Sequence, residues 1–170
     1  MLLLFSILIF ASFQDARTGK ISNWLILIGM ILGFVLQIHL YGLWGIFQII
    51  ITCVVPFFIL FPLFKIGVLG AGDIKIFIVM GFYMNLTDLL SCIIIAFIIG
   101  ASLALVKLYK EESFKERMEY LNNYLGQLIR TKEVLPYYFN EQNENEIDKT
   151  KIHMTIPILL SFLLHMGGVY

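Results

Sequence analysis

The sequence predicts an all-α membrane protein with six transmembrane helices and both termini outside the cell. Hydrophobic residues make up 59% of the 170 positions and charged residues only 14%, and the mean hydropathy is +0.87. A soluble fold of this size needs more polar residues to cover its surface, whereas lipid tails solvate apolar helices directly. The apolar residues gather in six stretches, and the basic residues gather in three of the connections between these stretches.

The six apolar stretches differ in length. Most are close to the roughly 20 residues that a helix needs to cross a bilayer, but the first and fourth are shorter. The first has no basic segment before it and no small-residue cleavage site after it, so we expect a helix rather than a signal peptide. A short apolar stretch beside an ionisable residue is typical of a water-filled recess. The stretches are 1–13, 24–40, 44–64, 74–84, 89–106 and 154–170.

The basic residues predict the orientation of the chain in the membrane. All twelve Lys and Arg residues lie in the first, third and fifth connections, and the other connections and both termini contain none. Connections rich in Lys and Arg stay in the cytoplasm. The three basic connections are therefore predicted to be cytoplasmic, in a multi-pass protein surrounded by membrane lipids.

The fifth connection, 107–151, is the only sizeable polar segment, and we expect it to be a cytoplasmic loop within a single membrane domain, 1–170. Its part 133–148 contains five acidic residues and no basic residue, which predicts a solvated loop. Its earlier part has apolar residues spaced by three and four, which predicts an amphipathic helix on the cytoplasmic membrane surface. These apolar residues are Phe114, Met118, Leu121, Leu125 and Leu128.

Charge and cysteine spacing exclude several classes of function. The formal net charge is zero, so the chain has no basic footprint for nucleic acid. Cys53 and Cys92 lie inside apolar stretches, without the CxxC or Cys/His spacing that holds zinc. We therefore expect no metal and no cofactor. His39, His153 and His165 fall near predicted span ends, where we expect an interfacial role rather than ligation or catalysis.

Two polar segments stand out from the apolar background, Asp15 to Asn23 in the first connection and Gly70 to Lys75 in the third. Each places a carboxyl group at the cytoplasmic end of a helix. In the second segment, two glycines before Asp73 let the chain turn sharply into a helix and let an extended peptide backbone approach closely. The two aspartates are therefore the candidate functional residues.

The two segments resemble the cytoplasmic motifs of the type IV prepilin peptidases, a family of Gly-x-Gly-Asp intramembrane aspartyl peptidases. Ser22 stands where the family usually has proline, a mild change because serine caps helices well. Pro157, at the start of the last apolar stretch, is similar to the proline of the family's final span. The matching motif positions are Asp15, Arg17, Lys20, Ile21 and Asn23, and then Gly70, Gly72, Asp73 and Lys75.

The resemblance implies an aspartic endopeptidase of a prokaryotic inner or plasma membrane that works without a cofactor. Its substrate would be a prepilin-like precursor with a short basic leader peptide. Larger members carry a zinc-binding insertion and methylate their product, so this chain is most similar to the small Tad or Flp type, with the archaeal preflagellin peptidases a more distant fit. The implied catalytic residues are Asp15 and Asp73, and the implied motif or substrate-approach residues are Gly70, Gly72, Lys75 and Asn23.

The mechanism that the resemblance implies uses two carboxyl groups that share one proton. The ionised carboxyl activates a water molecule, and the protonated one donates to the scissile carbonyl. Asp73 opens a helix, where the positive end of the helix dipole favours an anion, whereas Asp15 closes one, where the negative end disfavours it. We therefore expect Asp73 to be the base and Asp15 the acid.

The residues themselves leave two other functions open. A small transporter or channel would use Asp15 and Asp73 as ion or proton sites, because ionisable residues near membranes often serve that purpose. A non-catalytic assembly factor for a secretion apparatus is the other alternative. The presenilin and signal-peptide-peptidase group shares Gly-x-Gly-Asp, but its first aspartate follows a tyrosine, whereas Gln14 precedes Asp15 in this chain.

The acidic segment 133–148 leads to a prediction about substrate attraction. If it attracts a basic leader, neutralising its acids raises the apparent KM for the precursor and removes the dependence of KM on salt, because salt screens this attraction. Initial cleavage rates at two ionic strengths measure both effects. Unchanged kinetics would contradict the idea. The changes are Glu to Gln at Glu133, Glu141, Glu144 and Glu146, and Asp148→Asn.

Overall fold

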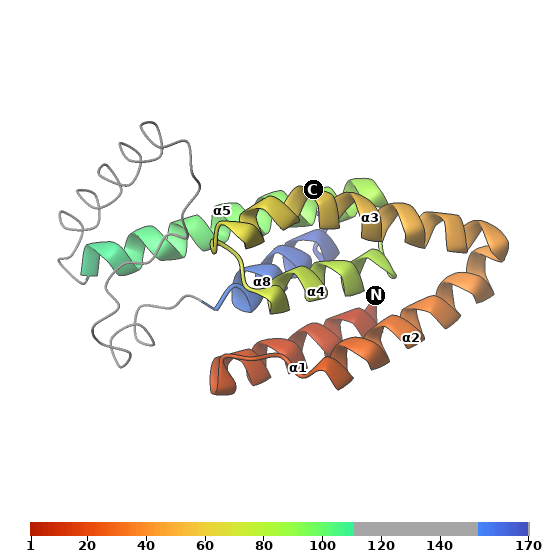
Figure 1. Ribbon diagram of the computed structural model, residues 1–170, viewed down its shortest axis with the longest axis horizontal. Coiled ribbons are helices and arrows are strands. Elements are labelled where there is room, and N and C mark those ends of the chain that lie inside the picture. The colour runs from red at the N-terminus through yellow and green to blue at the C-terminus, as the bar shows by residue number, and fades with distance from the viewer. Residues whose placement is uncertain (111–152, 170) are drawn as a thin grey trace.

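The computed structural model describes residues 1–110 and 153–169, and within these residues the fold is all-helical (Figure 1). The predicted amphipathic helix and the acidic segment 133–148 lie outside the described residues. Each apolar stretch predicted from the sequence corresponds to a helix. The helices are α1 (Leu2–Thr18), α2 (Asn23–Tyr41), α3 (Leu43–Lys65), α4 (Ala71–Gly81), α5 (Leu86–Lys110) and α8 (Thr155–Met166).

Three of the described helices, α2, α3 and α5, are long and apolar enough to cross a membrane. The other helices are shorter: α1 has 17 residues, α4 has 11 and α8 has 12. Eleven residues at 1.5 Å each extend about 16 Å, roughly half of the hydrocarbon core. The described part of the chain is therefore all-helical, with three helices suited to cross a membrane, and the arrangement of six spans with both termini outside remains a prediction.

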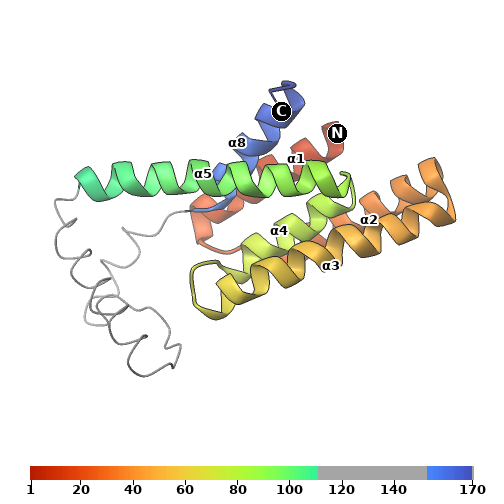
Figure 2. The same ribbon diagram turned by 90° about the horizontal axis from the view of Figure 1, so that it is seen from above.

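The short helix α4 forms the centre of the bundle. It packs against α2, α3 and α5, and Figure 2 shows it beside α3 on the inner side of the bundle. Six of its eleven residues are buried, among them Phe77 and Met80, which have no exposed surface. Lipid therefore has little access to α4, and the positions of both its ends depend on the surrounding helices.

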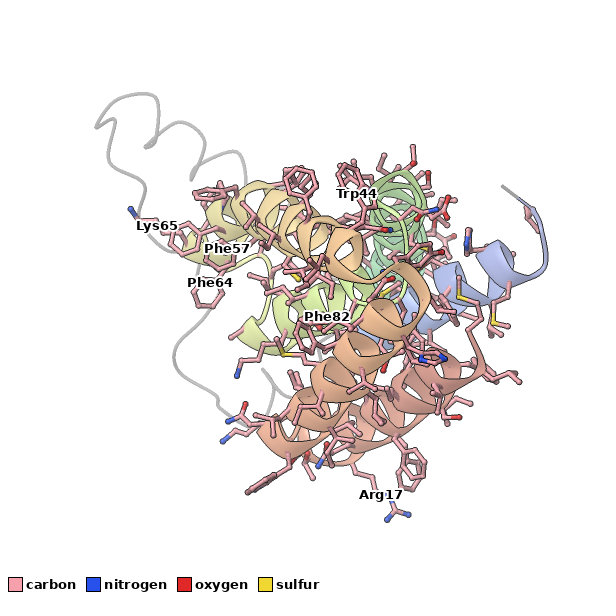
Figure 3. All side chains as sticks on the ribbon, turned by 90° about the vertical axis from the view of Figure 1, so that its right-hand side faces the viewer. Arg17, Trp44, Phe57, Phe64, Lys65 and Phe82 are labelled. Carbon is pink, nitrogen blue, oxygen red and sulfur yellow. The ribbon has the colours of Figure 1, made fainter. Side chains whose placement is uncertain are left out.

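The outer surface of the bundle is rich in large apolar side chains. Figure 3 shows Trp44, Phe57 and Phe64 on the outside of α3, whereas Phe82 lies toward the centre. Arg17 and Lys65 point away from the bundle in the same view. A protein that exposes large apolar side chains over whole helix faces is suited to lipid rather than water.

The helices α3 and α4 touch through their backbones at Gly81. A Cβ atom added to Gly81 would lie 2.7 Å from the carbonyl oxygen of Thr52, closer than carbon and oxygen pack. The Thr52 hydroxyl donates a hydrogen bond to the Gly81 carbonyl oxygen at 2.6 Å. On the opposite side, a Cβ atom at Gly33 of α2 would lie 2.6 Å from the Phe82 Cβ atom. Small residues thus let α2 and α3 enclose the C-terminal end of α4.

The two ends of the chain form the other part of the bundle. α8 packs against both α5 and α1, so the last described helix lies beside the first (Figures 1 and 2). Their contact buries Leu4, Leu8, Ile158 and Phe162 almost completely. Consequently, the start of α8 reaches the C-terminal end of α1, where Asp15 lies.

The contact at Gly81 predicts a specific loss of stability. Gly81→Ala should lower the free energy of unfolding by about 1–3 kcal/mol, because the new methyl group overlaps the backbone of α3. Thermal unfolding of the purified protein in detergent measures the change. Gly167→Ala is the matched control, since a Cβ atom there would lie 3.5 Å from its nearest neighbours and φ is −75°. Equal unfolding temperatures for the two variants would contradict the prediction.

Candidate active site

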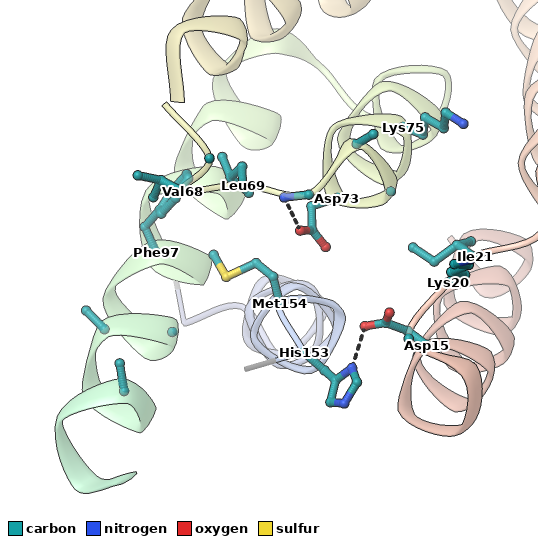
Figure 4. A pocket seen from close by; sticks show the side chains of 18 residues that line it. Asp15, Lys20, Ile21, Val68, Leu69, Asp73, Lys75, Phe97, His153 and Met154 are labelled. Atoms are coloured by element: carbon teal, nitrogen blue, oxygen red, sulfur yellow. Dashed lines mark hydrogen bonds and ion pairs between the residues drawn. The ribbon is translucent and has the colours of Figure 1, made fainter. Parts of the chain in front are cut away.

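A cavity of about 850 Å³ contains both aspartates. Asp15 enters it from α1 and Asp73 from the start of α4, and Figure 4 shows the two carboxyl groups facing the space between these helices. The first connection, the segment before α4, the middle of α5 and the start of α8 complete its walls. The fold therefore brings together the two acids that the sequence placed in separate motifs. Other predicted site residues in its lining are Gly70, Gly72 and Lys75.

Asp15 lies within α1 rather than after it. The apolar stretch ends at Phe13, but the helix continues to Thr18 and ends at Gly19, where φ is +62° and the backbone N–H donates to the Asp15 carbonyl oxygen at 2.8 Å. A left-handed residue of this kind is a common helix terminator. The continuation turns Asp15 inward, and only 8% of its surface is exposed.

The Asp15 carboxyl group is held by the start of α8. Thr155 Oγ1 donates a hydrogen bond to Asp15 Oδ2 at 2.8 Å. His153 Nδ1 lies 3.2 Å from the same oxygen (Figure 4), and the tautomer that carries its proton on Nδ1 donates a hydrogen bond to an ionised Asp15. In the chain, Thr155 follows Asp15 by 140 positions and His153 follows it by 138 positions.

Asp73 lies in the first turn of α4 and caps its N-terminus. The Gly70 N–H donates to Asp73 Oδ2 at 3.1 Å, and the Asp73 N–H donates to the Gly70 carbonyl oxygen at 3.2 Å. A Cβ atom on residue 70 would lie 3.1 Å from the same carboxyl oxygen. Gly70 therefore leaves room for the carboxyl group and fixes it at the positive end of the helix.

Gly72 is the point where the two motifs pack together. A Cβ atom at Gly72 would lie 2.9 Å from Ile21 Cδ1 of the first motif. The sequence predicted that glycine here serves the approach of a peptide, and in the structure Ile21 occupies the space beside Gly72. The glycine thus allows the Ile21 side chain to lie against the start of α4.

A second contact joins the same two motifs. Lys75 Nζ donates to Asn23 Oδ1 at 2.8 Å, so these two predicted site residues are partners. Lys75 lines the cavity, whereas Asn23 is not among the residues of its lining. The bond joins the first residue of α2 to α4, and the predicted role of Asn23 in substrate approach stays a prediction.

Ser22 makes two local contacts. Its side chain accepts a hydrogen bond from the Trp24 N–H at 3.3 Å and so caps α2, as the sequence predicted. Its own N–H donates to Gln14 Oε1 at 2.9 Å. Proline has no N–H and could not form this second bond. Ser22 therefore ties the first connection back to α1 beside Asp15.

Sequence reasoning missed the contribution of α5 and α8 to the site. His153 was expected at the membrane interface, and Thr155 was not singled out. The signal available in the sequence was a pair of polar residues, two positions apart, at the start of the last apolar stretch and on the side of the membrane predicted for the aspartates. The cavity residues from α5 and the start of α8 are Phe97, Gly100, Ala101, Ala104, His153 and Met154.

The site combines two carboxyl groups with an apolar wall. Within the part of the chain that the structure describes, no group of three or more His, Cys, Asp or Glu side chains could hold a metal ion. Phe97 and Met154 line one side of the cavity, and Lys20 and Lys75 lie in other parts of its lining. Two facing carboxyl groups can hold a water molecule and exchange protons with a bound substrate.

Comparison with known proteins identifies the family. Residues 2–105 match the model of the type IV leader peptidase family. The match covers more than half of the 170 residues and includes both aspartates, so the chain belongs to this family of peptidases. No curated protein and no solved structure shows a significant match. The family predicted from the two motifs is confirmed, and it implies prepilin-like substrates.

The contact between Gly72 and Ile21 can be tested with a double variant. Gly72→Ala should lower the cleavage rate about 5-fold, equivalent to about 1 kcal/mol, because its methyl group pushes against Ile21. Ile21→Val removes the Cδ1 atom, so the double variant should recover most of the rate. Initial rates for both single variants and the double variant measure the coupling. Strictly additive effects would rule out this contact as the cause.

Proposed function

We propose that this peptidase is an aspartic endopeptidase in which Asp15 and Asp73 form the catalytic pair. The observation that carries the proposal is that both carboxyl groups line one cavity and face each other across it (Figure 4). They come from different helices and from both family motifs. A pair of carboxyl groups in one cavity is the arrangement that acid and base catalysis of peptide hydrolysis requires.

The proposed reaction needs only a water molecule and the carboxyl pair. The water oxygen attacks the scissile carbonyl carbon while one carboxylate accepts a proton from the water. The other carboxyl group donates its proton to the carbonyl oxygen. Collapse of the tetrahedral intermediate breaks the C–N bond, and the leaving amine takes a proton from the pair. Hydrogen bond donors reach both Asp15 and Asp73 and favour the ionised form of each. They do not distinguish the acid from the base, so the proposal assigns the proton to the pair rather than to one residue. The separate acid and base roles expected from the helix ends remain a prediction.

The proposed substrate is a type IV prepilin-like precursor of the Flp or Tad kind, cut at the cytoplasmic membrane face. The charge pattern supports this location, because Lys20 and Lys75 line the cavity and Arg17 and Lys65 lie in the last turns of α1 and α3. In this proposal the chain crosses the cell membrane six times with both termini outside. The basic leader then stays in the cytoplasm while the apolar segment of the precursor remains in lipid.

The alternative of a transporter or channel has less support. It rests on the same two aspartates and adds no observation of its own, whereas family membership favours peptidase chemistry. The two functions differ in one measurable respect: a peptidase shortens a precursor, and a transporter does not.

Cleavage of a co-expressed precursor tests the proposal. Wild type should shorten the precursor, whereas Asp15→Ala, Asp73→Ala, Asp15→Asn and Asp73→Asn should each lower the cleavage rate at least about 10³-fold, because neither half of the pair can act alone. A mobility-shift assay and mass spectrometry of the product measure the reaction. Asp88→Asn is the matched control, since Asp88 lies in the first turn of α5 and not in the cavity lining. Retained cleavage in either Asn variant would refute the pair.

A further inference from the structure

We infer that Thr155 and His153, at the start of α8, are positioning residues that orient the Asp15 carboxyl group for the reaction. This inference rests on the proposed function of Asp15 and adds to it. Neither residue belongs to the two motifs, and both lie beyond residue 105, where the match to the family ends. The contacts that carry the inference are two hydrogen bonds to one carboxyl oxygen.

Both donors reach the same oxygen of Asp15. Thr155 Oγ1 lies 2.8 Å from Oδ2 and His153 Nδ1 lies 3.2 Å from it. Among the described residues, no side-chain donor reaches the other oxygen, Oδ1. Two donors that approach one oxygen from different residues restrict rotation of the carboxyl group about its Cβ–Cγ bond. Oδ1 is therefore the oxygen left for a water molecule or a substrate.

Thr155 is itself held rigidly. Its residue surface is 1% exposed, and its carbonyl oxygen accepts a hydrogen bond from Ser12 Oγ of α1 at 3.2 Å. Ser12 and Asp15 lie three positions apart, and therefore on one face of α1. One residue of α8 thus contacts two successive polar groups of the same helix face. This double contact fixes the rotation of α1 as well as the carboxyl group.

The neighbouring helix α5 fixes the start of α8 from the other side. A Cβ atom at Gly100 would lie 3.0 Å from the Met154 sulfur atom, so the glycine allows Met154 to pack closely against α5. Met154 lies between His153 and Thr155 in the chain. The two donors therefore flank an anchored residue. Groups held in this way are preorganised for the reaction. Loss of such support therefore lowers kcat more than it raises KM.

A pair of substitutions at position 155 isolates the hydroxyl group. Thr155→Ser and Thr155→Ala both lose the same methyl group, so any packing defect is common to them, and only the serine variant keeps the donor. With reconstituted full-length enzyme and a prepilin precursor, we expect the alanine variant to lose about 10- to 100-fold in kcat with little change in KM. The serine variant should keep kcat within about 3-fold of wild type.

A second pair tests the histidine. His153→Asn keeps an N–H donor near the place of Nδ1, whereas His153→Ala removes it, so kcat should be higher for the asparagine variant. Since the His153 side chain is 30% exposed, both variants should fold. This pair decides the question if Thr155→Ala does not fold.

Ser161 provides the control for a buried hydroxyl group of the same helix. It has no exposed surface and its hydroxyl group donates to the Ile158 carbonyl oxygen at 2.9 Å, but it does not line the cavity. Ser161→Ala should lower the unfolding temperature and leave kcat unchanged. If wild type cleaves and the alanine and serine variants at position 155 share one kcat, the inference is overturned. A wild-type enzyme that cleaves no precursor would instead overturn the proposed function.

Discussion

The backbone contact between α3 and α4 determines where the candidate active site can form. Gly81 approaches Thr52 so closely that no side chain fits between them, and the Thr52 hydroxyl bonds to the Gly81 carbonyl oxygen. Because α4 is short and enclosed, this contact at its C-terminal end limits the position of its N-terminal end. Asp73 lies there, so the carboxyl group depends on packing about two turns away.

The same dependence on close packing recurs around the cavity. Gly72 allows Ile21 to approach α4, and Gly100 allows Met154 to approach α5. In each case, glycine brings a second chain segment to the cavity lining. A membrane protein gains little free energy from burying apolar surface that lipid solvates equally well. Close packing and hydrogen bonds therefore contribute much of the free energy that holds its helices together. The glycines and the polar pairs therefore position the segments that carry the two acids.

The first connection shows how local chemistry supports this arrangement. Its ends are tied by the Gln14 bond to the Ser22 N–H and by the Lys75 bond to Asn23. The first bond fixes the turn beside Asp15, and the second fixes α2 to the helix that carries Asp73. Short-range and long-range contacts therefore act on the same two carboxyl groups. In this way the residues of the two motifs form a connected structure.

The sequence alone predicted the helical class and the apolar stretches from composition, and its two short motifs, through their resemblance to a known family, predicted the family and the two candidate aspartates. It did not determine that α1 continues past Phe13, since polar residues extend a helix without an apolar signal. Only the tertiary structure brought Thr155 and His153 to Asp15. Their contact joins residues about 140 positions apart and depends on how α8 packs between α1 and α5. No local sequence pattern predicts that packing.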